Sequence, residues 1–102
     1  MSADQALTPF TGFSVPTYTP VPDELFDQLM VDLSLAELRV LLYICRRTFG
    51  FKKREDAIAL SQMLGGIRRR DGVRLDRGVG LSRRALLPAI RSLVEHGVIV
   101  KT

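Results

Sequence analysis

The chain has 102 residues, of which 46% are hydrophobic, enough for one compact domain with a single core. Its net charge is +4 and its pI is about 9.8. It has no apolar run of membrane-spanning length and no basic, apolar start typical of a secretory signal, so we expect a soluble cytoplasmic protein without a membrane partner.

The charges are distributed unevenly along the chain. Residues 1–45 contain one base against six acids, whereas residues 46–102 contain fourteen bases against five acids. Such a division predicts that one face or end of the domain is built for a polyanion.

The residues that support catalysis or metal binding are sparse. Cys45 is the only cysteine, so neither a disulfide nor a cysteine-based zinc site can form within the chain, and we expect this side chain in the core. His96 is the only histidine and lies beside a predicted helix end, where it suits the helix dipole better than general-base catalysis. We therefore predict no enzymatic activity, no metal and no cofactor.

The first segment, residues 1–21, is rich in Pro and Thr and shows no sustained period. We interpret it as an extended arm preceding a DNA-binding domain over residues 22–102. Its isolated aromatic residues suit either a contact surface or an unstructured leader.

Two helices are predicted next. Apolar residues recur at helical spacing over 23–31, after acids that favour a helix start. Ser34 and Glu37 form a capping-box pattern that starts a second helix, which we expect to end near Thr48. Its expected inward face is Leu38, Leu41, Leu42 and Cys45.

A short apolar run at 57–60 predicts a strand, followed by a brief helix capped by Ser61 and ended by Gly65 and Gly66. Residues 67–77 then place an Asp-Gly pair between polar runs, which predicts a hairpin, the alternative being a disordered basic loop. Asp71 and Asp76 are interpreted as turn and charge-balancing residues. The candidate phosphate contacts in and before this segment are Lys52, Lys53, Arg68, Arg69, Arg70, Arg74 and Arg77.

The last predicted helix spans residues 82–96, with Ser82 as N-cap and Gly97 as the left-handed stop. Its inward stripe is Leu86, Ala89, Ile90 and Leu93. Pro88 is outward, so a base contact there must be apolar, and we expect a bend near Arg84. On its own this is equally an amphipathic helix with a solvated charged face. The candidate DNA contacts are Ser82, Arg83, Arg84, Leu87, Pro88 and Arg91.

Residues 98–100 read as a closing strand. The element order predicts a mainly α domain with a small β-sheet, a winged helix-turn-helix whose recognition helix is preceded by an inserted basic hairpin or loop. A lone closing strand would leave one edge open, so we also expect weak self-association through residues 98–101, unless the arm covers that edge.

Four stretches of the sequence carry a family resemblance. Residues 19–26, 33–51, 58–63 and 80–84 resemble the N-terminal winged-helix domain of phage replication protein O and related replisome-organiser proteins. The resemblance places Ser82, Arg83, Arg84 and Arg91 on the recognition helix and implies binding of double-stranded DNA at or near a replication origin. Members commonly continue into a region that contacts replication-machinery proteins, so this chain is either a trimmed domain or a short relative. A winged-helix transcriptional regulator and a winged-helix protein-interaction module are the alternatives.

Overall fold

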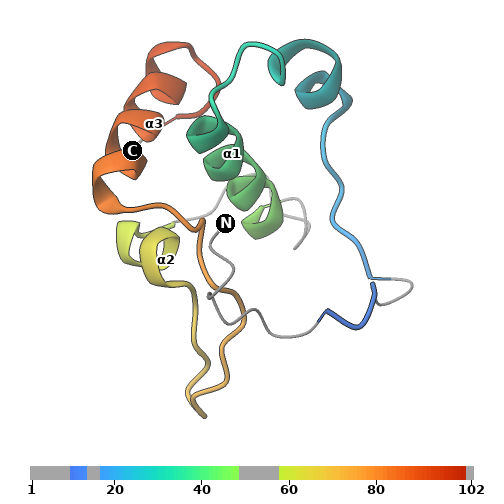
Figure 1. The fold of residues 1–102 in the computed structure, drawn as a ribbon, viewed down its shortest axis with the longest axis vertical. Helices are drawn as coiled ribbons and strands as arrows, with labels where there is room; N and C mark the ends of the chain where they lie inside the picture. The colour runs from blue at the N-terminus through green and yellow to red at the C-terminus, as the bar shows by residue number, and fades with distance from the viewer. Residues whose placement is uncertain (1–9, 14–16, 49–57, 101–102) are drawn as a thin grey trace.

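The computed structural model describes residues 10–13, 17–48 and 58–100. Its helices are η1 (Leu25–Leu29), α1 (Leu35–Arg47), α2 (Leu60–Gly65) and α3 (Arg83–Glu95). Helices α1 and α3 pack against each other, and α2 lies beside the first turn of α3 (Figure 1). The predicted mainly helical fold is confirmed. Within the described residues the β structure is a single antiparallel bridge, so the small sheet of a winged helix is not present there.

Helix α1 begins as its sequence predicts. The Ser34 hydroxyl accepts from the Glu37 amide at 3.1 Å, and the Glu37 carboxylate accepts from the Ser34 amide at 2.9 Å. The predicted inward face is wrong at Leu42, which is 40% exposed, because α1 packs in two directions rather than one. Val40 and Tyr43 face α3, and Leu41 and Cys45 face η1.

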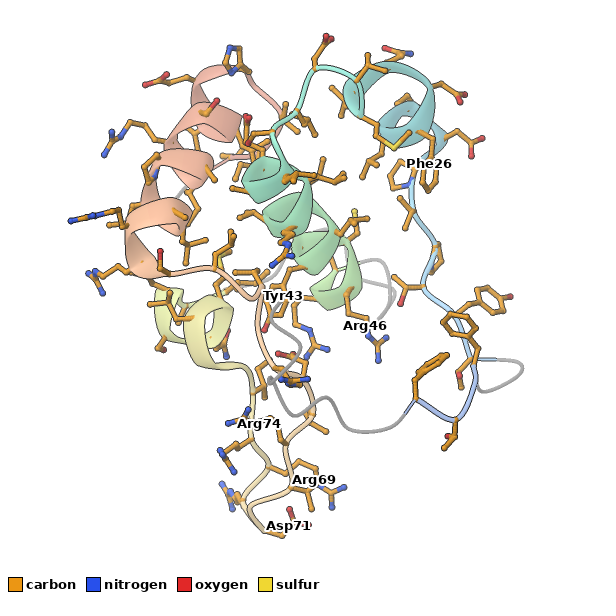
Figure 2. All side chains as sticks on the ribbon, viewed as in Figure 1. Phe26, Tyr43, Arg46, Arg69, Asp71 and Arg74 are labelled. Carbon is orange, nitrogen blue, oxygen red and sulfur yellow. The ribbon has the colours of Figure 1, made fainter. Side chains whose placement is uncertain are left out.

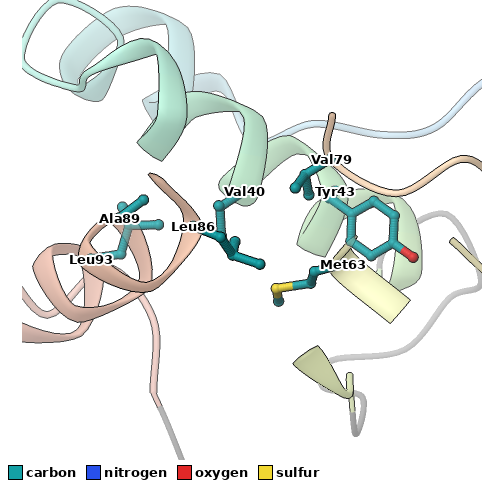
Figure 3. Packing of buried hydrophobic residues seen from close by; sticks show 7 residues of the cluster. All are labelled: Val40, Tyr43, Met63, Val79, Leu86, Ala89 and Leu93. Carbon is teal, nitrogen blue, oxygen red and sulfur yellow. The ribbon is translucent and has the colours of Figure 1, made fainter. Parts of the chain in front are cut away.

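The core joins three helices and one loop (Figure 3). Leu86, Leu93 and Val40 are its largest fully buried side chains. Around them lie Tyr43 from α1, Met63 from α2, Ala89 from α3 and Val79 from the segment that leads into α3. The inward stripe predicted for α3 is confirmed, with Ile90 partly buried at its margin.

The helix predicted over residues 23–31 is present but wider than an α-helix. The Met30 amide donates to the Leu25 carbonyl at 2.8 Å, the five-residue step of a π-helix. Leu25 is thereby buried against Leu41 and Cys45. Before η1, residues 10–13 and 17–20 form neither helix nor strand, and the division into an arm and a domain stays a prediction.

The strand predicted at 57–60 is wrong over the described residues 58–60, while residue 57 lies outside them. Ala59 is the N-cap of α2, and its amide donates to the Gln62 side chain at 3.0 Å. The run therefore starts a helix before the expected Ser61 cap. A short apolar run suits either a strand or the start of a helix, so its apolar character alone did not predict which of the two would form.

The strand predicted at 98–100 is also wrong. Gly97, at φ 72°, donates to the Val94 carbonyl at 3.0 Å, and Val98 donates to the Leu93 carbonyl at 2.9 Å. These two bonds form a Schellman motif, which folds Val98 and Ile99 back onto the core. The Val98 amide is thus already paired, and the open strand edge expected to mediate self-association is absent from residues 98–100.

Residues 67–77 form the predicted hairpin, here called the basic hairpin, which projects away from α1 and α3 (Figure 1). Arg69 donates to Val73 and Leu75 donates to Ile67, both at 2.7 Å. The Gly72 amide closes a turn on the Arg69 carbonyl at 2.9 Å, with Gly72 at φ 88°. This is a three-residue loop with a left-handed glycine, one residue longer than the two-residue turn that an Asp-Gly pair suggests.

The hairpin foot, residues 66 and 76–79, is closed by backbone contacts with the end of α2. Gly78 has φ 79°, and a Cβ built there would overlap the Met63 carbonyl oxygen, which accepts from the Val79 amide at 2.8 Å. An alanine at a left-handed position costs about 1–2 kcal/mol in backbone strain. We expect Gly78→Ala to lower the free energy of unfolding by more than this amount, because the added Cβ also overlaps the Met63 carbonyl. Urea unfolding followed by circular dichroism measures this.

Gly72→Ala is the matched control for this substitution. Gly72 also has a positive φ, but a Cβ there would meet nothing within 4 Å. Equal losses of stability in the two variants would show that the close approach at the foot contributes nothing.

Candidate nucleic-acid interface

Helix α3 is anchored on one side and exposed on the other. The Ser82 hydroxyl accepts from the Ala85 amide at 3.2 Å, which confirms the predicted N-cap. The six candidate residues at and after this cap are all exposed. Arg84, Pro88 and Arg91 lie opposite the buried stripe, whereas Arg83 and Leu87 lie to one side of it. We call this set the recognition face; it consists of Ser82, Arg83, Arg84, Leu87, Pro88 and Arg91.

The recognition face combines charge with a small apolar centre. Leu87 is 38% exposed beside Pro88, and arginines lie on either side of them along the helix. Helix α3 continues through Pro88, which lacks an N–H and leaves the Arg84 carbonyl without a bond from residue 88. Guanidinium groups suit phosphates and guanine edges, and the apolar centre suits a thymine methyl.

The basic hairpin presents five exposed arginines. Arg68 and Arg74 face each other across its single bridge, at the position without direct hydrogen bonds, where opposite side chains approach most closely. Like charges directly opposite destabilise a free hairpin, so the pair favours an anion between or beside the two groups. Near the tip, Arg69 forms an ion pair with Asp71 at 2.8 Å (Figure 2), as expected for a charge-balancing residue. The five are Arg68, Arg69, Arg70, Arg74 and Arg77.

The structure therefore separates the candidate residues into two groups. The recognition face lies on α3, and the basic hairpin, with Arg69 and Arg74, extends beyond α2 (Figures 1 and 2). Lys52 and Lys53, the remaining candidates, lie outside the described residues.

One hydrogen bond to the start of α3 was missed by the sequence analysis. Arg39 of α1 donates to the Gly80 carbonyl at 2.9 Å, two residues before the Ser82 cap. At the other end of α3, the Ser92 hydroxyl donates to Glu37 at 2.8 Å. The Ser34 amide, and then the Ser92 hydroxyl, lower the pKa of Glu37 by stabilising its charged form. Helix α1 thus holds α3 near both of its ends.

A second missed feature is a polar cluster inside the fold. The Tyr43 hydroxyl lies 3.1 Å from both carboxylate oxygens of Asp76, and Arg47 lies 3.5 Å from the same carboxylate. Burial, together with the negative charge of Asp76, raises the pKa of Tyr43 to about 12. The spacing of Tyr43 and Arg47, four residues apart on one helical face, was the only signal of this cluster in the sequence.

The single cysteine and the single histidine occupy structural positions. Cys45 is buried, as predicted, and burial raises the pKa of its thiol. His96 is the C-cap residue of α3, with its Nδ1 atom 2.8 Å from the Ser92 carbonyl oxygen. Among the described residues no three His, Cys, Asp or Glu side chains gather as metal ligands, and no described helix could cross a membrane.

Comparison with known proteins gives one match. A family model described as bacteriophage replication protein O matches residues 16–102, a span that includes all the described helices and the basic hairpin. Searches of curated proteins and of solved structures found no match. The resemblance read from the four sequence stretches is confirmed.

Proposed function

Because the chain belongs to the bacteriophage replication protein O family, we propose that it binds double-stranded DNA at or near a replication origin as part of replication initiation. The observation that carries this proposal is the recognition face of α3, whose arginines are exposed on a helix fixed by its buried opposite side. The major groove of DNA is wide enough to admit such a helix.

The two groups of candidate residues have different roles in this proposal. The recognition face reads bases, with arginines placed for guanine edges and Leu87 and Pro88 for thymine methyl groups. The basic hairpin holds phosphates, which adds affinity without sequence information. Helix α2, the hairpin and α3 then act as a helix-turn-helix with an enlarged connection. The proposal includes replication-machinery proteins as partners and requires neither catalysis nor a cofactor.

Replacing Arg84 and Arg91 by Ala tests the recognition face. Removing one bidentate guanine contact is expected to cost about 1–3 kcal/mol of binding free energy. Both side chains are exposed, so the stability of the fold should change little. Gel-shift titration at fixed salt, on a site selected from random duplexes, measures the weakening.

Two controls accompany the double variant. Arg46→Ala removes one exposed arginine of α1, away from α3 and the basic hairpin (Figure 2), and should bind almost as the unmodified protein does. Replacing Arg84 and Arg91 by Lys keeps the charge but removes the bidentate fork, so specificity should fall more than general affinity. Unchanged affinity of the double Ala variant would refute the proposal.

The alternatives from the sequence predict different results. A protein-interaction module gives little dependence on salt, whereas neutralised phosphates give a linear fall of log affinity with log salt. A transcriptional regulator uses the same surface, and the family membership favours the replication role. In the selected sites, two-fold symmetry would indicate a dimer and direct repeats a head-to-tail arrangement.

A further inference from the structure

Asp76 makes the contacts that join the basic hairpin to α1. Its Oδ1 atom accepts from the Gly78 amide at 2.8 Å, and both of its oxygens lie 3.1 Å from the Tyr43 hydroxyl. Arg47 is 3.5 Å away, with 7% of its side chain exposed against 19% for Asp76. A single carboxylate thus meets a turn within the hairpin foot and two side chains of α1.

These contacts connect the hairpin to α1, which packs against α3. Tyr43 and Arg47 belong to the helix that packs directly against α3, and the Arg47 guanidinium carbon lies 5.8 Å from the centre of the Tyr43 ring. The Gly78 bond folds the chain so that Val79 enters the core and donates to the Met63 carbonyl. The Asp76 carboxylate therefore connects the hairpin to α1, the helix that also packs against α3.

The rest of the hairpin has little else to hold it. Residues 68–75 are all exposed, and two paired strands are marginal in water without packing against another element. Opposed Arg68 and Arg74 weaken the pair further. The direction of the hairpin relative to α3 must then be set at its foot.

We propose that Asp76 is a positioning residue that holds the hairpin arginines in register with the recognition face, so that both reach one DNA duplex together. The inference rests on the proposed DNA binding. Asp76 itself touches no DNA in this arrangement. It acts through Tyr43, Arg47 and the Gly78 amide.

Asp76→Asn and Asp71→Asn form a matched pair that tests the proposal by the sign of the effect. Both remove one negative charge from the same hairpin. Charge alone predicts tighter DNA binding in both variants, because a carboxylate repels phosphates. Positioning predicts that Asp71→Asn binds as tightly as the unmodified protein or more tightly, whereas Asp76→Asn binds more weakly.

The salt dependence measures how many phosphates the bound protein neutralises. For each phosphate that Asp76→Asn no longer neutralises, the log–log salt slope should become shallower by about 0.9, and the affinity should fall about eightfold at 0.1 M salt. A general fall in stability that leaves the folded protein intact would not change this slope. Asp76→Asn that binds as tightly as the unmodified protein, with an unchanged slope, overturns the proposal.

A measurement on the free protein separates this inference from DNA binding itself. The ¹⁵N heteronuclear NOE of the Leu75 amide, which donates to the Ile67 carbonyl, should fall in Asp76→Asn and stay unchanged in Asp71→Asn. The Val73 amide donates to the Asp71 side chain at 3.1 Å, so it would respond to Asp71→Asn directly. If no variant binds DNA, the proposed function fails, and these NOE values still show whether Asp76 orders the hairpin. Unchanged NOE values in Asp76→Asn contradict the positioning role.

Tyr43→Phe provides a second variant should Asp76→Asn fail to fold. It removes the hydroxyl that reaches Asp76 and leaves the aromatic ring in the core. The hairpin NOE values should fall and the salt slope should become shallower, both by less than in Asp76→Asn. A folded Tyr43→Phe protein with both quantities unchanged would overturn the proposal.

Discussion

Replacing the five arginines of the basic hairpin by Gln is expected to make the log–log salt slope of DNA binding shallower by up to about 4.5 units, at about 0.9 per neutralised phosphate. The weakening should be similar for every DNA sequence, because phosphates carry no base identity. Arg69 is already paired with Asp71 at 2.8 Å, so its share should be the smallest. The positions changed are Arg68, Arg69, Arg70, Arg74 and Arg77.

Fluorescence anisotropy with several unrelated duplexes, each titrated over a range of salt concentrations, measures this slope. A variant with Lys at the same five positions is the matched control, since it keeps the charge and should retain most of the slope. A fall in affinity confined to one DNA sequence would mean that the hairpin reads bases rather than phosphates.

Leu86→Ala is expected to lower the free energy of unfolding by about 2–5 kcal/mol, because it opens a cavity where α1 and α3 meet. Leu86 has no exposed surface and belongs to the same cluster as Val40 and Leu93, which are also fully buried (Figure 3). For a domain of this size such a decrease is a large fraction of the total stability. Urea unfolding followed by circular dichroism gives the value.

Leu87→Ala, one residue further along α3, is the control. Leu87 is 38% exposed on the recognition face, so its truncation should cost little stability. It should instead reduce affinity for DNA sites that place a thymine methyl against this position. Equal destabilisation by the two substitutions would show that the core assignment is wrong.

The two long helices were predictable because their ends are specified locally. Ser34 and Glu37 are three residues apart and form a reciprocal capping box at the start of α1. Ser82 caps the start of α3, and Gly97 ends it. The outward position of the arginines followed from helical spacing alone, and so did the buried stripe. Much of the candidate interface was therefore visible in the sequence.

The predicted strands failed because a short apolar run has more than one use. After Gly97, the apolar residues 98 and 99 close a helix end instead of pairing with a strand. Residues 58–60 lead into α2. In both places the structure of the run is determined by hydrogen bonds to a neighbouring helix, and the apolar residues of the run do not reveal those bonds.

The cluster around Asp76 was not predictable for a different reason. Its bond to Tyr43 joins residues 33 positions apart, and only the assembled fold brings them together. The sequence interpretation balanced Asp76 against the arginines of its own segment, whereas its ion-pair partner is Arg47 of α1. That interpretation did not predict the hydrogen bonds of Asp76 to Tyr43 and to the Gly78 amide.

The backbone closure at the hairpin foot has a consequence for how such a protein can diversify. Gly78 lies close to the Met63 carbonyl of α2, and Gly66 lies close to the Asp76 carbonyl on the opposite side of the foot. Residues 68–75, beyond the foot, are exposed and contribute no buried residue to the core. Substitutions or changes of length between residues 68 and 75 therefore leave the packing of α1 and α3 untouched. The charge of the hairpin can therefore vary while the core that fixes α3 stays unchanged.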